Sequence, residues 1–249
     1  MAEVRPADED AASRPLDLRL YLVTDPVLGG GRPLVELVAA AVRGGVTVVQ
    51  LRDKSASDDE LLRQALAIRE VLAPVGVPLV VNDRVDVALA ADADGVHVGT
   101  GDASPTRARE RLGRDAIVGW SLENLEQVRD PALTACSYLA ASPVWSTPTK
   151  TDTARALGLA GVARLRALTT LPLVAIGGID ASRVTEVVRA GADGVAVVSA
   201  VMAADDPEAA ARQLREAVDA ALDARRTDGQ VDPHRAGIRR RAHARADGA

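Results

Sequence analysis

The sequence predicts an α/β fold of one domain, a closed (β/α)8 barrel of the TIM type. The chain has 249 residues, and one such barrel takes about 250. Eight short aliphatic runs alternate along it with eight amphipathic stretches. The aliphatic runs are continuous, which is typical of parallel strands whose outer face is covered by helices.

The predicted strands are short runs rich in Val, Leu and Ile. In chain order they span residues 20–24, 46–51, 79–82, 95–98, 117–120, 138–141, 173–176 and 194–198. Hydrophobic residues make up 47% of the chain, with two Trp, two Tyr and no Phe. We therefore expect a core built from aliphatic side chains.

The predicted helices lie between these strands and have apolar residues at helical spacing. They span residues 34–43, 58–72, 85–91, 106–112, 122–128, 158–168, 181–190 and 207–222. Ser57, Ser104 and Asp180 are expected at helix starts, and Gly45 and Gly191 at helix ends. An open doubly wound sheet is the alternative, because periodicity does not show closure, but no Gly-x-Gly-x-x-Gly follows the first strand.

The two ends of the chain differ from its centre. Residues 1–16 are polar and are expected to form a flexible arm, residues 17–224 the catalytic barrel, and residues 225–249 a basic, disordered tail. An RNA or anionic-surface contact is the alternative for the tail. The formal net charge of −5 gives no case for binding of nucleic acid by the whole chain.

Cysteine use and hydropathy bear on location. The single cysteine, Cys136, excludes a disulfide within the chain and fits a reducing compartment. The first residues contain no apolar signal core, and no apolar run approaches the roughly 18 residues of a membrane helix. We expect a cytoplasmic protein with small-molecule partners and no membrane contact, and a homo-oligomer is left open.

Two acids follow neighbouring predicted strands, Asp83 after residues 79–82 and Asp102 after residues 95–98. Parallel strands of a barrel end at one rim, so the two carboxylates are expected to converge there. Mg²⁺ typically binds through one or two carboxylates together with substrate phosphates. The sequence therefore predicts a magnesium and polyphosphate site, the alternatives being that Asp83 caps a helix and Asp102 turns the chain.

Cations are expected at the same rim. Arg52 and Lys54 follow the second predicted strand, and Lys150 follows the sixth. Arginine offers a fork that matches phosphate oxygens, while lysine supplies a mobile point charge. Alternatively, Lys54 is a solvated residue paired with Asp53.

Hydroxyl-bearing residues and glycines follow the later strands. Residues 142–153 are rich in hydroxyl groups and are expected to form a lid. Gly177 and Gly178 follow the seventh strand, where many barrels bind a phosphate monoester. His97 lies within a strand and is expected to form internal hydrogen bonds, and Cys136 is expected to be a packing residue.

Several of these stretches together resemble the thiamine-phosphate synthase (thiamine-phosphate pyrophosphorylase) family. They are Tyr-Leu-Val-Thr-Asp at 21–25, Gln-Leu-Arg-Asp-Lys at 50–54, Val-Asn-Asp-Arg at 81–84, Gly-Val-His-Val-Gly at 95–99, Pro-Val-Trp-Ser-Thr-Pro-Thr-Lys at 143–150, Ile-Gly-Gly-Ile at 176–179 and Val-Ser-Ala at 198–200. Any one of them is unspecific, but their combination and order are specific to the family.

The resemblance implies a transferase that joins 4-amino-5-hydroxymethyl-2-methylpyrimidine diphosphate to 4-methyl-5-(2-phosphoethyl)thiazole, giving thiamine monophosphate and pyrophosphate. It implies one Mg²⁺ per site, and loss of pyrophosphate before the thiazole nitrogen attacks. It assigns the metal to Asp83 and Asp102, the diphosphate and the catalytic step to Arg52, Lys54, Ser121 and Lys150 with Asn82, the pyrimidine side to Gln50, and the thiazole phosphate to Thr147, Thr149, Gly178, Val198 and Ser199. Ser142 and Thr100 depart from the family, which more usually has glycine and glutamine there.

Three other functions compete with this one. A thiazole tautomerase barrel would resemble this chain over most of its length but needs a histidine near the end of the fifth strand, where this chain has Ser121. A sugar-phosphate epimerase needs paired acid and base groups and usually several histidines, which His97 alone does not supply. A phosphate-sensing barrel without turnover is the non-enzymatic alternative.

Overall fold

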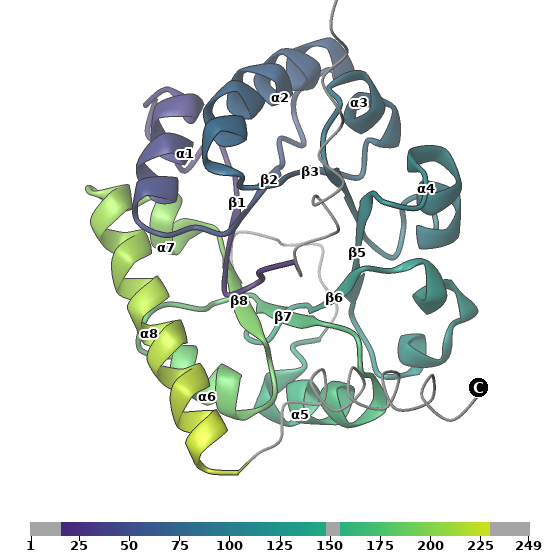
Figure 1. The fold of residues 1–249 in the computed structure, drawn as a ribbon, viewed down its shortest axis with the longest axis vertical. Helices are drawn as coiled ribbons and strands as arrows, with labels where there is room; N and C mark the ends of the chain where they lie inside the picture. The colour runs from purple at the N-terminus through teal and green to yellow at the C-terminus, as the bar shows by residue number, and fades with distance from the viewer. Residues whose placement is uncertain (1–15, 148–154, 230–249) are drawn as a thin grey trace, which may run out of the picture.

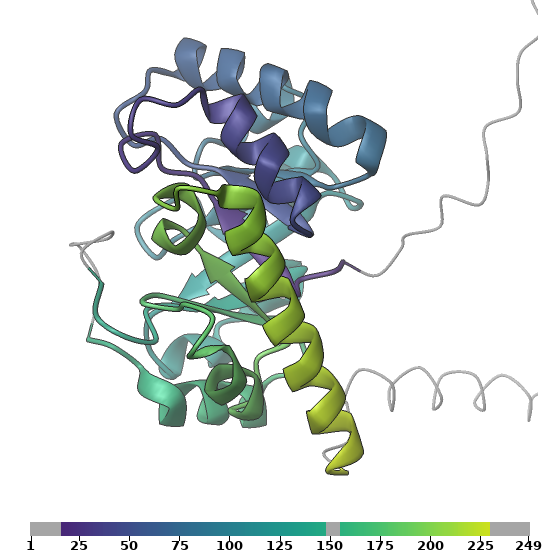
Figure 2. The same ribbon diagram turned by 90° about the vertical axis from the view of Figure 1, so that its left-hand side faces the viewer.

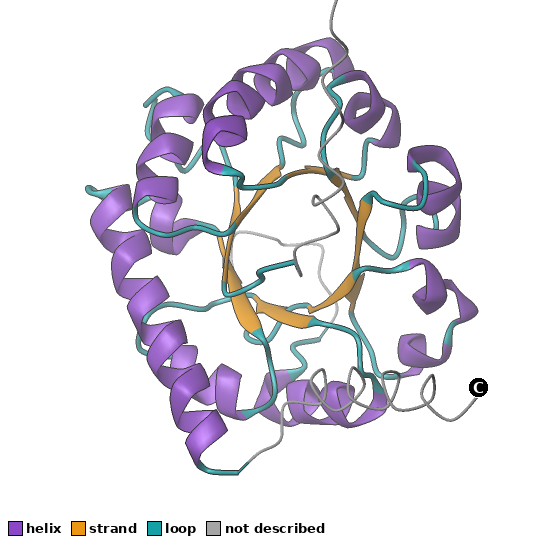
Figure 3. Ribbon diagram, viewed as in Figure 1, coloured by secondary structure: helices purple, strands orange, loops and turns teal. Residues whose placement is uncertain are grey.

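The computed structural model describes residues 16–147 and 155–229. Within this part of the chain, eight parallel strands form a closed barrel in which each strand pairs with the next and β8 pairs with β1 (Figure 3). The strands are β1 (Leu20–Val23), β2 (Val48–Leu51), β3 (Leu79–Asn82), β4 (Gly95–Val98), β5 (Ile117–Leu122), β6 (Tyr138–Ala141), β7 (Leu173–Ile176) and β8 (Gly194–Val197). The predicted (β/α)8 fold is confirmed, and the open sheet is excluded.

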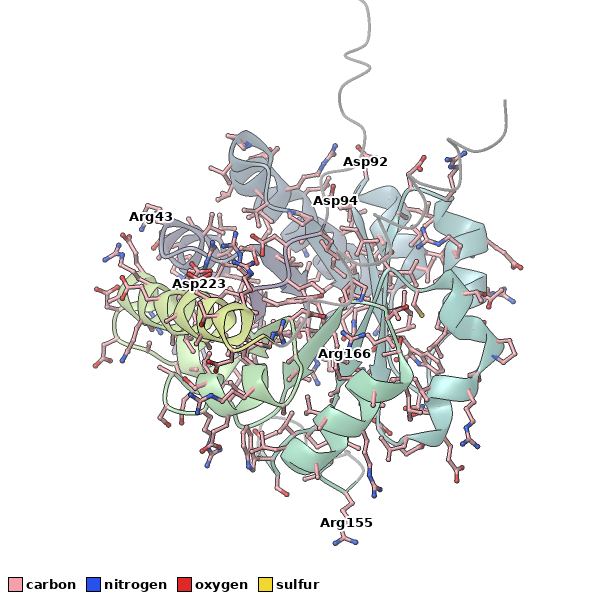
Figure 4. The ribbon with its side chains drawn as sticks, turned by 60° about the horizontal axis from the view of Figure 1, so that its bottom comes forward. Arg43, Asp92, Asp94, Arg155, Arg166 and Asp223 are labelled. Atoms are coloured by element: carbon pink, nitrogen blue, oxygen red, sulfur yellow. The ribbon has the colours of Figure 1, made fainter. Side chains whose placement is uncertain are left out.

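Helices cover the outside of the barrel (Figure 1). They are α1 (Leu34–Arg43), α2 (Asp58–Leu72), α3 (Val85–Ala90), α4 (Pro105–Leu112), α5 (Gly158–Leu168), α6 (Val184–Arg189), α7 (Ser199–Met202) and α8 (Pro207–Thr227), with three 3-10 turns, η1 (Ala73–Val75), η2 (Glu126–Arg129) and η3 (Pro131–Ala135). The long helix α8 crosses one side of the barrel and packs against α1 and α6 (Figure 2). Arg43 at the end of α1 and Arg155, which precedes α5, point outward from the barrel (Figure 4).

The predicted helix over residues 122–128 is wrong. Leu122 still belongs to β5, and two 3-10 turns follow it. The Asn124 side chain accepts hydrogen bonds from the amides of Glu126 and Gln127, so the side chain satisfies donors that a helix would direct to its own carbonyls. Pro131 then starts the second turn without a backbone N–H.

The boundaries of most other helices agree with those predicted from the sequence. Ser57 and Ser104 are the N-caps of α2 and α4, as predicted. Asp180 instead forms a turn, accepting from the amide and hydroxyl of Ser182, and α6 begins only at Val184. The last helix runs to Thr227, past the predicted barrel end at 224, because the Arg225 guanidinium donates to carbonyls at the end of α6 and before β8.

The core has two layers that follow from the alternation of side chains along each strand. One layer lies between strands and helices and is aliphatic, with Leu22, Val49 and Leu51 among its members. The other fills the barrel interior and contains Val48, Val80 and Val174 together with both tyrosines of the chain, Tyr21 and Tyr138. No helix within residues 16–147 and 155–229 has the length and apolarity needed to cross a membrane.

Candidate active site

A cleft opens where the strands end at their carboxyl side, enclosing about 880 Å³ including the space at its open mouth. Of the residues predicted from the sequence, the cleft is lined by Gln50, Arg52, Asn82, Ser121, Thr147, Gly178, Val198 and Ser199. Lys54, Asp83 and Asp102 lie beside it, and Thr149 and Lys150 are outside the described residues.

The two predicted acids meet. The Lys54 ammonium lies 2.5 Å from Oδ2 of Asp83, whose side chain is 12% exposed. Burial raises the pKa of the Asp102 carboxyl, and a hydrogen bond with the Asp83 carboxyl raises it further. Two acidic groups and one cation therefore converge at the ends of β2, β3 and β4.

The backbone at Asp83 is unusual. Its φ is +63°, a left-handed conformation that non-glycine residues seldom adopt and that is found more often at functional sites. The N-cap of α3 is Arg84 and no side chain caps that helix, so the alternative of Asp83 as a helix cap is wrong. Asp102 does turn the chain, since its Oδ2 accepts from the Gly99 amide at 2.8 Å.

This donor set fits a hard divalent cation. Carboxylate oxygens are the ligands that Mg²⁺ prefers, and a cation between Asp83 and Asp102 relieves the proximity of the two acids. Among residues 16–147 and 155–229, no cluster of three or more His, Cys, Asp or Glu side chains is arranged to bind a metal ion. A metal here would thus keep open positions for water and substrate oxygens.

Hydrogen bonds position the cations. The Arg52 amide donates to Oγ1 of Thr24 at 2.9 Å, and Oγ1 donates to the Arg52 carbonyl at 3.2 Å, which ties the ends of β1 and β2 together. The Arg52 guanidinium lies 4.0 Å from Asp25 and lines the cleft. Lys54 pairs with Asp83 and not with Asp53, because the Asp53 carboxylate accepts from the amide and hydroxyl of Ser55.

The other side of the mouth is formed by backbone. Gly177 and Gly178 have φ of +107° and +65°, and a Cβ on Gly178 would lie 3.1 Å from the Cβ of Trp145. The amides of Val144 and Trp145 donate to the carbonyls of Ile176 and Gly177, which joins the chain after β6 to the end of β7. Arg183 stacks 4.8 Å above the Trp145 ring and donates to the Gly178 carbonyl.

The two departures from the family lie near these groups, one lining the cleft and one on the surface. Ser142 is 5% exposed and lines the cleft, and its φ is not positive, so serine is accommodated there without left-handed strain. Thr100 is exposed. Of the expected lid, residues 148–153 are outside the described part of the chain.

Tyr21 and Tyr138 also line the cleft and were not predicted from the sequence to be site residues. Gln50 donates to Tyr21, the two phenols bond to each other, Tyr138 bonds to Nδ1 of His97, and Nε2 of His97 bonds to Ser121. The signal was available, because the only two tyrosines of the chain lie in aliphatic strands. His97 forms internal hydrogen bonds as predicted.

Cys136 is a packing residue, as predicted. It lies in the core between strands and helices, and its thiol contacts the Ala132 carbonyl at 3.6 Å. Burial raises the pKa of the thiol to about 12, so a thiolate is disfavoured.

A closed (β/α)8 barrel with acids, cations and glycine turns gathered at its carboxyl rim belongs to the class of barrel enzymes that act on phosphorylated small molecules. The sequence profile described as thiamine monophosphate synthase matches residues 20–201. The thiamine-phosphate synthase of Albidiferax ferrireducens is 55% identical over 82% of this chain and 93% of that protein, and that of Xanthobacter autotrophicus is 54% identical over 84% and 99%.

Solved structures show the same similarity as the sequence relatives. The thiamine phosphate pyrophosphorylase from Pyrococcus furiosus superposes with a TM-score of 0.76 at 38% identity, covering 84% of this chain and 98% of that one. A 3-hexulose-6-phosphate synthase, with a TM-score of 0.57 at 18% identity over 80% and 99% of the two chains, shares the fold alone. The chain belongs to the thiamine-phosphate synthase family, transferases of thiamine biosynthesis.

Proposed function

We propose that this enzyme condenses 4-amino-5-hydroxymethyl-2-methylpyrimidine diphosphate with 4-methyl-5-(2-phosphoethyl)thiazole. The bond between the pyrimidine methylene carbon and the diphosphate oxygen breaks, and its electron pair leaves with pyrophosphate. The thiazole nitrogen lone pair forms the new C–N bond of thiamine monophosphate. The observation that carries the proposal is the meeting of Asp83, Asp102 and Lys54 beside a cleft lined by Arg52.

The diphosphate is assigned to the charged side of the mouth. Arg52, Lys54, Asn82 and Ser121 extend from neighbouring strand ends and supply cationic and neutral hydrogen-bond donors, and Lys150 is assigned there from the sequence. Asp83 and Asp102 are assigned to one Mg²⁺. When bound, the ion would supply positive charge against the departing pyrophosphate.

The thiazole phosphate is assigned to the opposite side, at Thr147, Gly178, Val198 and Ser199, with Thr149 assigned from the sequence. Glycine at 178 lets the backbone approach a phosphate closely. Gln50, deeper in the cleft and 4% exposed, is assigned to the pyrimidine. The two substrates would then meet above the barrel interior.

A dissociative order suits these residues. The electron-poor pyrimidine left after departure of pyrophosphate has to be shielded from water, and Val23, Ile176 and Ala196 provide apolar walls. The step needs charge stabilisation and positioning more than a protein base. His97, the one histidine among the residues lining the cleft, has both ring nitrogens in hydrogen bonds, which disfavours an epimerase reading.

The deciding experiment mixes purified protein with both substrates, with and without Mg²⁺, and measures thiamine monophosphate and pyrophosphate. We expect the two products in equal amounts and only with the metal. Binding without turnover would favour the phosphate-sensing alternative, and conversion of a thiazole phosphate isomer alone would favour the tautomerase. A normal secondary isotope effect from deuterium on the pyrimidine methylene is expected for the dissociative order, and its absence would contradict that order.

Location and partners stay predictions from the sequence. We propose a cytoplasmic enzyme whose partners are its small-molecule substrates, on the basis of composition and net charge. Fractionation of cells expressing the chain and light scattering of the purified protein would test the location and the homo-oligomer that the sequence leaves open.

A further inference from the structure

A single chain of hydrogen bonds crosses the interior of the barrel beneath the cleft. It runs from Nε2 of Gln50 to Oη of Tyr21 at 2.9 Å and on to Oη of Tyr138 at 2.7 Å. It continues to Nδ1 of His97 at 2.9 Å and from Nε2 of His97 to Oγ of Ser121 at 2.8 Å. All five side chains are buried and all line the cleft, so a bound substrate would lie directly over them.

The number of protons that each group can donate fixes the direction of these hydrogen bonds. The Gln50 nitrogen has only protons to offer, so the Tyr21 oxygen accepts there and donates its own proton to Tyr138. Tyr138 is fully buried, and its remaining bond is to His97. Because a buried hydroxyl without a partner is costly, Tyr138 donates to Nδ1 of His97. Burial raises the pKa of both phenols, so each keeps the proton that it passes on.

The direction then fixes the imidazole. Nδ1 of His97 accepts and carries no proton, so the ring proton is on Nε2 and is donated to the Ser121 oxygen. The Ser121 hydroxyl proton takes part in none of the hydrogen bonds found among the described residues, and the side chain lines the cleft. At the other end, Gln50 retains its second N–H and its carbonyl oxygen as hydrogen-bonding groups for a ligand.

Gly119 makes the hydrogen bond between Tyr138 and His97 possible. His97, Gly119 and Tyr138 are neighbours in register across β4, β5 and β6. A Cβ on Gly119 would overlap the phenol of Tyr138 and lie 2.5 Å from Nδ1 of His97. The missing side chain at this level of the barrel is therefore what lets the tyrosine reach the histidine.

We propose that Gln50, Tyr21, Tyr138 and His97 form a directional relay that fixes Ser121 as a hydrogen-bond donor to the departing diphosphate. Tyr21, Tyr138 and His97 are positioning residues, and Ser121 is the member of the relay that touches the diphosphate. The assignment of the diphosphate to Ser121 rests on the proposed function. A donor oriented in advance stabilises developing negative charge without reorganising during the reaction. Without the relay, Ser121 is free to turn its proton toward Nε2 of His97.

The first test reads the histidine tautomer in the free protein. The chain has three histidines, and comparison with His97→Gln assigns the His97 signals in a long-range ¹H–¹⁵N correlation spectrum. We expect Nε2 protonated and Nδ1 unprotonated. Tyr138→Phe is expected to convert this single tautomer into a mixture, whereas Tyr21→Phe, the same change one bond further away, is expected to retain it. A protonated Nδ1 in the wild type, or an unchanged tautomer in Tyr138→Phe, would overturn the relay.

The second test uses kinetics. Ser121→Ala is expected to lower kcat about 100-fold, as for loss of one oxyanion donor, and Tyr138→Phe about 10-fold through loss of one neutral hydrogen bond. Because Tyr138 acts only through Ser121, the double variant should be no slower than Ser121→Ala. His97→Gln, which retains an N–H near the Nε2 position, should exceed His97→Asn in kcat. Multiplicative losses in the double variant, or equal kcat for Gln and Asn at 97, would overturn the proposal.

The two tests separate this proposal from the proposed function. If the wild type forms no thiamine monophosphate, the proposed function fails, and the tautomer of the substrate-free protein still decides whether the relay exists. If products form but the tautomer is wrong, the relay fails alone. Thermal unfolding of each variant identifies changes that act through folding, and the conservative Tyr138→Phe and His97→Gln variants keep the test usable if His97→Asn is unstable.

Discussion

Under the proposed function, the two sides of the cleft mouth bind negative charge by different means. The charged half consists of Arg52, Lys54, Asn82, Asp83 and Asp102 at the ends of β2, β3 and β4. The neutral half consists of Thr147, Gly177, Gly178, Val198 and Ser199, which follow β6, β7 and β8. The first half presents mostly charged side chains, and the second presents glycine backbone at the position assigned to the thiazole phosphate. We therefore expect activity to be lost when side chains are removed from the charged half and when side chains are added to the neutral half.

The largest effect is expected in the charged half, from Asp83→Ala. Loss of one of the two proposed metal ligands would leave the departing diphosphate poorly neutralised, and we expect kcat to fall about 1,000-fold. The measurement is pyrophosphate release over a range of Mg²⁺ concentrations. Asp86→Ala is the matched control, because Asp86 is exposed on α3 and pairs with Arg111. A smaller loss in Asp83→Ala than in His97→Asn would point to acid/base chemistry and remove the distinction between the halves.

Among substitutions in the two halves of the mouth, Arg52→Ala is expected to have the next largest effect. An ionic hydrogen bond contributes roughly 2 kcal/mol, so kcat/KM for the pyrimidine diphosphate should fall about 30-fold. KM for the thiazole phosphate should change little, because that substrate is assigned to the neutral half. Arg63→Ala, which removes an exposed arginine paired with Glu60 on α2, is the control. Equal losses toward both substrates would mean that the halves are not separate subsites.

The charged half was also the easier one to predict from sequence. Arg52, Asp83 and Asp102 follow aliphatic strands, and the rule that parallel strands end at one rim places them together without knowledge of distances. The interior chain through Tyr21 and Tyr138 could not be found this way, because it depends on register between strands and on the missing side chain at Gly119. The helix expected over 122–128 failed because Asn124 captures backbone amides locally, a competition that apolar periodicity does not register.

Gly178→Ala tests the neutral half. The added Cβ would lie 3.1 Å from Trp145 and 3.3 Å from Arg183 and would displace the backbone from the assigned phosphate position. We expect KM for the thiazole phosphate to rise about 10-fold, as for one hydrogen bond to a charged group, with KM for the pyrimidine diphosphate unchanged.

Gly76→Ala is the matched control for this substitution. Gly76 has the same φ of +65°, and its added Cβ would meet nothing within 4 Å. Both variants should lose about 1 kcal/mol of unfolding free energy from left-handed strain, but only Gly178→Ala should lose affinity. If Gly76→Ala raised KM equally, the effect would be one of general stability and not of the phosphate subsite.

The smallest effect is expected from Arg183→Ala, which alters the neutral half without removing a side chain that lines the cleft. Arg183 stacks on Trp145 and donates to the Gly178 carbonyl, so it connects the chain after β6 to the glycine turn after β7. An exposed cation–π contact contributes about 0.5–1 kcal/mol, and we expect kcat/KM for the thiazole phosphate to fall only about 3-fold. Arg189→Ala at the end of α6 is the control. A selective loss for the thiazole phosphate would show that the neutral half depends on how firmly its backbone is held, whereas a loss toward both substrates would place Arg183 among the residues that support the whole cleft.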